Sequence, residues 1–167
     1  MKKPFVILFL YCFVSLMFVS CYSFTGASIS PEVKTITVQF FPNRAPNVQP
    51  TLSNVFTEAL KDRFVTQTNL ELVNRNGDLN FEGEITGYQV SPQAYQGNET
   101  AALNRLTITV RVNFVNRLEP DKSFDSSFSR YTDFESSKSL ATVETTLIEE
   151  IVNQLTEDVF NKAVVNW

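Results

Sequence analysis

Residues 105–117 read RLTITVRVNFVNR, and apolar and polar side chains alternate along them as far as Phe114. The apolar parity holds Leu106, Ile108, Val110, Val112 and Phe114, and the other parity holds Thr107, Thr109, Arg111 and Asn113. Successive side chains of a strand point to opposite faces, so this stretch predicts a half-buried strand. Residues 122–134 follow a turn at Glu119-Pro120-Asp121 and carry Phe124, Phe128 and Phe134 on one parity. We therefore expect the two segments to form a long hairpin.

Two further strands are expected upstream of this hairpin. Residues 33–41 alternate in the same way and stop at Pro42, since proline cannot donate to a strand ladder. Residues 79–90 also alternate, but their apolar phase slips at Gly87, which predicts a bulge. Residues 70–73 (LELV) are a short apolar piece outside these strands.

Two segments have apolar residues at helical spacing. Residues 51–67 place Leu52, Phe56, Leu60 and Phe64 on one stripe, with Thr51 as the expected N-cap. Residues 140–164 carry a broad stripe around Ile151 and Leu155, and glutamates lie on the other side. Both helices are therefore expected to pack against a core.

The element order is β-α-β-β-β-α, and it predicts an α+β domain. The helix after the first strand allows that strand and the next to be parallel through a right-handed crossover, whereas the later strands form an antiparallel meander. The simplest arrangement is two helices packed on one face of a mixed four-stranded sheet. The other face would then carry threonine, serine, asparagine, arginine and a few aromatic residues.

The N-terminus predicts export and lipidation. Lys2 and Lys3 precede an apolar run, and small Ser20 precedes Cys21, as in a bacterial lipoprotein signal, although Phe18 stands where leucine is usual. An uncleaved transmembrane anchor is the alternative, but a span needs roughly 20 apolar residues and this run is shorter. Cys12 is a poorer cleavage point because bulky Tyr11 precedes it.

We therefore expect a signal peptide at residues 1–20, a lipidated linker at residues 21–32 and a single domain at residues 33–167. A bacterial lipoprotein normally carries three acyl chains on its cysteine. Each buried acyl CH₂ contributes about 0.8 kcal/mol, so several chains anchor a protein firmly without a membrane span.

Composition excludes several classes of function. The 14 basic residues include Lys2 and Lys3, so 12 remain beyond the leader against 18 acidic residues, and the net charge becomes −6. That balance argues against a nucleic-acid partner. The chain has no histidine, the commonest nitrogen ligand for metals and a common general base, so neither a metal site nor a cofactor is expected.

No catalytic motif stands out in the sequence. Glu82 and Glu84 share one side of a predicted strand, and paired carboxylates can hydrolyse sugars, but the same spacing is ordinary on any solvated strand face. No Gly-x-Ser-x-Gly elbow, phosphate-binding P-loop or dinucleotide-binding motif occurs. A binding or assembly role fits better than an enzyme.

Several scattered segments together resemble one family of lipoproteins. They are Tyr22-Ser23-Phe24-Thr25-Gly26 after the cysteine, the strand at residues 35–41 with Asn43-Arg44-Ala45, the GEITGY segment at residues 83–88, and Phe128-Ser129-Arg130-Tyr131. The chain resembles the LptE family, the lipopolysaccharide-assembly lipoproteins of the outer-membrane translocon, in its Bacteroidetes-like form. Tyr22 departs from the family pattern, in which a glycine directly after the cysteine would be expected.

The resemblance implies a function and partners. Family members plug the large β-barrel translocon subunit, LptD, assist its assembly, support lipopolysaccharide insertion into the outer leaflet and bind lipopolysaccharide. No acidic residue closely follows Cys21. A nearby aspartate would favour the inner membrane and an acidic cluster would favour surface export. We therefore expect a lipid-anchored protein on the periplasmic side of the outer membrane.

Cations near the hairpin are the candidate contacts for lipopolysaccharide or for the barrel. They are Arg105, Arg111, Arg117, Lys122 and Arg130. Lipopolysaccharide carries phosphates and acidic sugars, which arginine and lysine bind well. The alternative is that these side chains are ordinary solvated residues or contact the barrel.

A rival class shares the first half of the pattern. Periplasmic lipoproteins that activate peptidoglycan synthases or build secretion pores also open with a strand, a proline, an amphipathic helix and a Leu-x-Leu-Val segment. The long hairpin at residues 105–134 favours the lipopolysaccharide-assembly interpretation.

Overall fold

The computed structural model describes residues 29–93 and 102–164. The expected signal peptide, Cys21 and most of the linker lie outside these residues. The elements are β1 (Thr35–Val38), α2 (Leu52–Gln67), β2 (Glu71–Leu72), β3 (Leu79–Gln93), β4 (Leu103–Asn116), the 3₁₀ turn η1 (Pro120–Lys122), β5 (Phe124–Glu135) and α3 (Leu140–Val164). All but β2 match a segment expected from the sequence.

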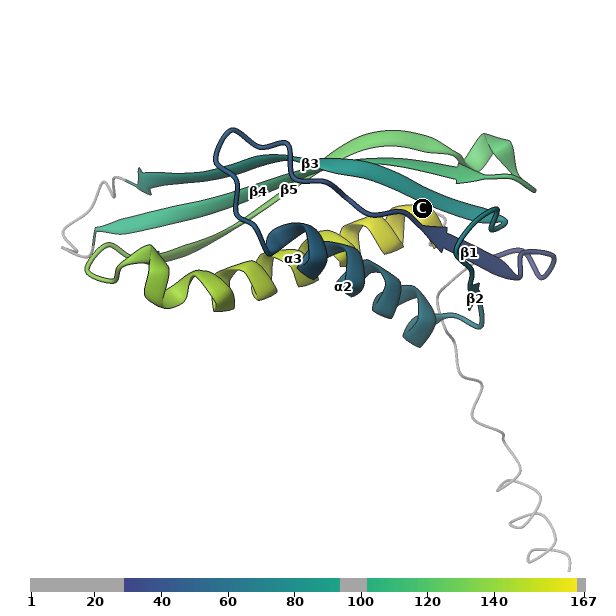
Figure 1. The fold of residues 1–167 in the computed structure, drawn as a ribbon, viewed down its shortest axis with the longest axis horizontal. Helices are drawn as coiled ribbons and strands as arrows, with labels where there is room; N and C mark the ends of the chain where they lie inside the picture. The colour runs from purple at the N-terminus through teal and green to yellow at the C-terminus, as the bar shows by residue number, and fades with distance from the viewer. Residues whose placement is uncertain (1–28, 94–101, 165–167) are drawn as a thin grey trace, which may run out of the picture.

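The sheet is mixed and has the order β2-β1-β3-β4-β5. Strand β1 is parallel to β2 and β3, whereas β4 is antiparallel to both β3 and β5. Both helices lie on the same face of the sheet (Figure 1). The α+β class and the one-sided helix layer are therefore confirmed.

The expected count of four strands is wrong, because β2 makes a fifth. It comes from the short apolar piece at residues 70–73, where Glu71 and Leu72 pair with Thr35 and Ile36. Both β2 residues are exposed, so this strand lacks the alternation of buried and exposed side chains by which a strand is predicted from sequence. After α2 the chain turns back toward the sheet, and this places β2 beside β1.

The expected bulge and hairpin are both present. The register of β3 against β4 shifts between Ile85 and Gly87, where the apolar phase slips. Strands β4 and β5 pair without interruption from Leu103 opposite Glu135 to Phe114 opposite Phe124.

A line of phenylalanine rings runs through the core from α3 to β5. Ring centroids lie 5.0 Å apart for Phe160 and Phe64, 4.8 Å for Phe64 and Phe81, 4.6 Å for Phe81 and Phe114, and 5.2 Å for Phe114 and Phe124. Such pairs contribute about 0.5–1.5 kcal/mol each beyond the burial of their area. The line therefore ties both helices to three neighbouring strands.

The segment between β1 and α2 follows the edge of β3 where β1 has ended. Ile85 N donates to Pro42 O at 2.9 Å, and Arg44 N donates to Ile85 O at 2.8 Å. Phe41 is fully buried and packs against Phe56 at 5.0 Å. Hydrogen bonds and burial together fix this irregular segment against the sheet.

Thr51 holds the N-cap position of α2 but its side chain does not cap the helix. Instead, Gln49 Oε1 accepts from the backbone N–H groups of Thr51, at 2.7 Å, and Leu52, at 3.0 Å. The expected N-cap position is right, but the expected capping side chain is wrong. The side chain of Gln49, two residues before Thr51, accepts the hydrogen bonds of the free N–H groups at the start of α2.

The loop before β3 is held to β1 by Asp78. Its Oδ2 accepts from the backbone N–H groups of Lys34 and Thr35 and from the Thr35 hydroxyl, each at 2.9 Å. These hydrogen bonds lower the pKa of Asp78, those from Lys34 N and the Thr35 side chain most strongly. The loop thereby aligns β1 with β3.

Gly83 and Gly87 give a matched test of this packing. A Cβ at Gly83 would lie 2.0 Å from Arg111 O and 2.7 Å from Phe41 Cε1, whereas one at Gly87 would lie 3.1 Å from the Thr109 side chain. We expect Gly83→Ala to lower the free energy of unfolding by about 3 kcal/mol or more, because a backbone carbonyl cannot move aside. Gly87→Ala should cost less than about 1 kcal/mol. Urea unfolding of both variants checks this, and equal losses would contradict the packing described.

Candidate interaction surfaces

The sheet face opposite the helices is polar, and no described helix covers it (Figure 1). We call it the open face. Its residues are Glu82, Glu84, Gln89 and Ser91 of β3, Arg105, Thr107, Thr109, Arg111 and Asn113 of β4, and Asp125, Ser127, Ser129, Tyr131 and Asp133 of β5. They alternate with the buried residues of the same strands, so the expected polar face exists.

Arg105 on the open face contacts both a carboxylate and an aromatic ring. Its Nε and Nη2 donate to the two carboxylate oxygens of Asp133 at 2.7 and 2.8 Å. Its guanidinium carbon lies 3.6 Å from the ring centroid of Tyr131, which is 51% exposed. The hydrogen bond from Arg105 lowers the pKa of Asp133. The guanidinium of Arg105 is therefore held between a carboxylate and an aromatic ring that remains half exposed.

A second arginine is paired in the same way. Arg111 donates to Asp125 from Nε at 2.9 Å and from Nη2 at 2.6 Å, and this hydrogen bonding lowers the pKa of Asp125. Thr109 and Ser129 hydroxyls lie 3.0 Å apart between the two ion pairs. Two arginines thus stand among four carboxylates, so the open face offers no net positive charge to a phosphate.

The other candidate cations lie elsewhere. Arg130 is on the helix side of β5 and donates to Asp158 of α3 at 2.5 and 2.6 Å. Lys122 pairs with Glu119 in the turn at 2.9 Å. Arg117, at the same turn, donates to the side-chain oxygen of Asn76 at 3.4 Å. The five cations therefore do not form one cluster: two lie on the open face, two at the turn and one against α3.

The carboxylates considered for acid–base chemistry have an ordinary setting. Glu82 accepts a hydrogen bond from Asn113 Nδ2 at 2.8 Å on the open face. Within residues 29–93 and 102–164, no three or more histidine, cysteine, aspartate or glutamate side chains gather closely enough to hold a metal ion.

None of the described helices combines the length and hydropathy needed to cross a bilayer.

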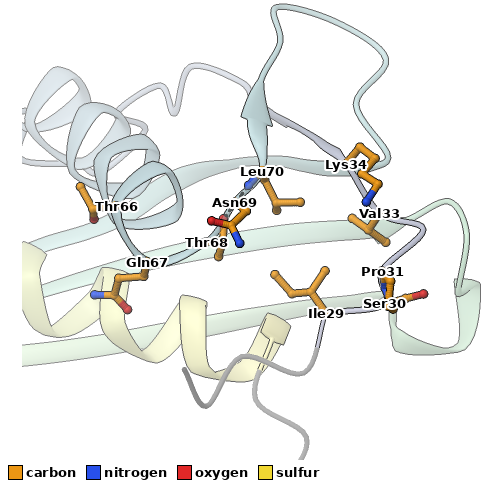
Figure 2. Close-up of a pocket in the computed structure, with 10 residues that line it drawn as sticks. All are labelled: Ile29, Ser30, Pro31, Val33, Lys34, Thr66, Gln67, Thr68, Asn69 and Leu70. Carbon is orange, nitrogen blue, oxygen red and sulfur yellow. Dashed lines mark hydrogen bonds between the residues drawn. The ribbon is translucent and has the colours of Figure 1, made fainter. Parts of the chain in front are cut away.

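A pocket of about 320 Å³ lies where the N-terminal segment meets the end of α2 (Figure 2). Ile29, Val33 and Leu70 supply apolar side chains, and Gln67 and Asn69 supply amides. Among the described residues that line it, Lys34 alone is charged. No local sequence pattern predicts this pocket, because its two walls are more than 30 residues apart in the chain.

Comparison with known proteins identifies a family and a fold. The family model described as LptE, lipopolysaccharide-assembly, matches residues 33–163. No curated protein sequence matches the chain.

Solved structures share the fold at low identity. The hypothetical protein CT253 from Chlamydia trachomatis aligns with a TM-score of 0.54 and 8% identity, over 80% of this chain and 99% of that one. A protein described as a homolog of the neuraminyllactose-binding hemagglutinin from Helicobacter pylori gives 0.52 and 8%, over 84% and 88%. A minor lipoprotein from Acinetobacter baumannii gives 0.47 and 13%, over 78% and 91%. At these identities the first two likenesses establish the fold alone.

The Arg105–Asp133 pair should contribute measurably to stability. Single and double alanine variants are expected to give a coupling energy of about 0.5–1 kcal/mol at pH 7, since the pair is bidentate and partly buried. The folded pKa of Asp133 is lowered, so this contribution is present above the carboxyl's ordinary pKa and is lost as the pH falls through the lowered value.

Urea unfolding at pH 7 and below pH 3 measures both effects. The more exposed Lys138–Glu135 pair is the control and should couple more weakly. A coupling energy for Arg105 and Asp133 that is unchanged by acid would show that it does not come from the charge on Asp133, and would contradict this prediction.

Proposed function

Since the chain belongs to the LptE family of lipopolysaccharide-assembly proteins, we propose that it is the lipoprotein subunit of an outer-membrane lipopolysaccharide translocon. In this role it plugs an LptD-like β-barrel, assists assembly of that barrel and supports insertion of lipopolysaccharide into the outer leaflet. The observation that carries the proposal is the family match over residues 33–163, which is nearly the whole domain.

The architecture supports a role as a plug rather than as a catalyst. The lumen of a large outer-membrane barrel is polar and lined by alternating side chains. A domain whose apolar residues are turned inward, and whose open face carries hydroxyls and neutralised ion pairs, can sit in such a lumen without exposing its core.

Acylation of Cys21 would hold the domain close to its membrane. Seven residues lie between Cys21 and Ile29, where the described structure begins, and the eight Cα–Cα steps between the two span at most about 28 Å when extended. The pole that carries Ile29 and the end of α2 is therefore proposed to face the inner leaflet.

Of the five candidate cations, Arg117 is the best placed to receive a lipopolysaccharide phosphate. Arg105, Arg111, Lys122 and Arg130 each hold a carboxylate of this chain, which an incoming anion would have to displace. Arg117, at the end of β4, donates to the neutral amide of Asn76. The carboxylate of Asp78 is near enough to interact with Arg117 electrostatically, but the hydrogen bonds it accepts come from Lys34 and Thr35. Contact with lipopolysaccharide is accordingly proposed at the turn between β4 and β5, with the other four as weaker contacts.

Depletion and rescue test this function. Cells depleted of the protein should lose assembled barrel and outer-leaflet lipopolysaccharide, and the wild-type gene should restore both. Cys21→Ser should restore neither, because it cannot be acylated and the domain would leave the membrane. Barrel abundance and surface lipopolysaccharide are measured in parallel. Normal surface lipopolysaccharide in depleted cells would contradict the proposal.

Capture of the lipidated protein separates this function from its rival. Recovery of a very large β-barrel supports the assembly role, whereas recovery of a peptidoglycan synthase or of a secretion pore supports the alternative.

A further inference from the structure

Among residues 29–93 and 102–164, one edge of the sheet is protected and the other is open. On the protected side β2 has two residues, and the segment that follows β1 bonds to Ile85 of β3. Pro92 stands near the far end of β3, where it is in register with Asn104 of β4 but cannot donate to a strand on its other side. Natural proteins protect sheet edges in such ways because unpaired backbone invites another strand.

The edge formed by β5 has none of these features. It is 12 residues long, contains no proline and pairs with β4 in unbroken register. No described strand lies beyond it in the sheet order. Helix α3 meets β5 from the helix-covered face, through Arg130 with Asp158 and Lys162 with Ser126.

The hydrogen-bond pattern shows which backbone groups of β5 face outward. Ser136 N donates to Ala102 O at 2.9 Å, in the same register as the β4–β5 ladder. Bonded pairs alternate along an antiparallel ladder, so the even-numbered residues of β5 bond to β4. The N–H and C=O groups of Asp125, Ser127, Ser129, Tyr131 and Asp133 therefore point away from the sheet.

In the described parts of the chain these outward groups make no hydrogen bond to another backbone or side chain, and they repeat at the spacing of a strand. Five alternate residues extend over roughly 26 Å. An extended polypeptide is the ligand whose donors and acceptors match such a row. The charged side chains beside the row are already neutralised, since Asp125 and Asp133 hold Arg111 and Arg105.

A second copy of the chain is a poor occupant. Two β5 edges that paired through all five outward residues would be centred on Ser129. Asp125 of each copy would then lie opposite Asp133 of the other. Although each carboxylate is bonded to an arginine of its own chain, two carboxylates directly opposite one another still weaken a strand pair. The edge therefore favours a strand from a different protein.

We propose that the outer edge of β5 is a strand-addition site that pairs, backbone to backbone, with an extended segment of the translocon barrel protein. This inference rests on the proposed function and specifies how the two proteins meet. The recognition is by main-chain hydrogen bonds, so it tolerates variation in side chains on both sides.

Ser127 allows a test of the backbone alone. It is exposed, and its N–H points outward. Ser127→Pro removes that donor while the ladder to β4 stays intact, because proline is accepted on edge strands where its nitrogen faces solvent. Ser127→Ala removes the hydroxyl and keeps the N–H, so it is the matched control.

The full-length lipidated variants are captured from detergent-extracted outer membranes, and the recovered barrel is quantified. Ser127→Ala should match the wild type, whereas Ser127→Pro should recover about fivefold less barrel or lower, with both thermal unfolding midpoints close to wild type. Equal recovery by the proline variant overturns strand addition and leaves the proposed function standing. Absence of the barrel from the wild-type capture overturns both.

A photoreactive residue at position 127 gives a second readout that does not depend on proline. We expect adducts with the barrel protein from this position and none from Val65, which is 48% exposed on α2. Adducts of two copies of the chain would show that the edge self-associates, and that result, or the lack of any adduct, would overturn the proposal.

Discussion

Contact between Phe81 and its two neighbours, Phe64 of α2 and Phe114 of β4, is the constraint on which the rest of the structure depends. All three rings are fully buried, and the line continues to Phe160 of α3 and Phe124 of β5. It joins both helices to one face of the sheet. Because the buried apolar side chains of the three long strands point to that face, the opposite face has to satisfy its polar groups by itself.

The polar groups of the open face are satisfied by ion pairs and hydrogen bonds within the chain. Arg105 and Arg111 are held by Asp133 and Asp125, and the hydroxyls between them bond to each other. Such a surface is well solvated and carries no excess of positive charge. It suits contact with the polar wall of a barrel better than binding of phosphates. For this reason we propose Arg117, at the turn between β4 and β5, as the contact for an anion.

Much of the fold could be predicted from the sequence, because alternation and helical spacing reflect a core on one face. These patterns predicted the hairpin at residues 105–134, both helices and the irregularity at Gly87. Strand β2 left none, since its two residues are exposed and are positioned by the end of α2. The ion pairs could not be predicted either, because Arg105 and Asp133 are brought together only by the register of β4 against β5. The free edge depends on the order of strands in the sheet, which no local pattern encodes.

The central claim is that this domain works as a lipid-tethered assembly subunit bound to a barrel. Intact mass spectrometry of the complex captured from outer membranes tests it most directly. The account predicts a chain that begins at Cys21, carries the added mass of acyl chains and is recovered together with a large β-barrel protein. A chain that still carries residues 1–20, or an unmodified thiol at Cys21, would contradict it.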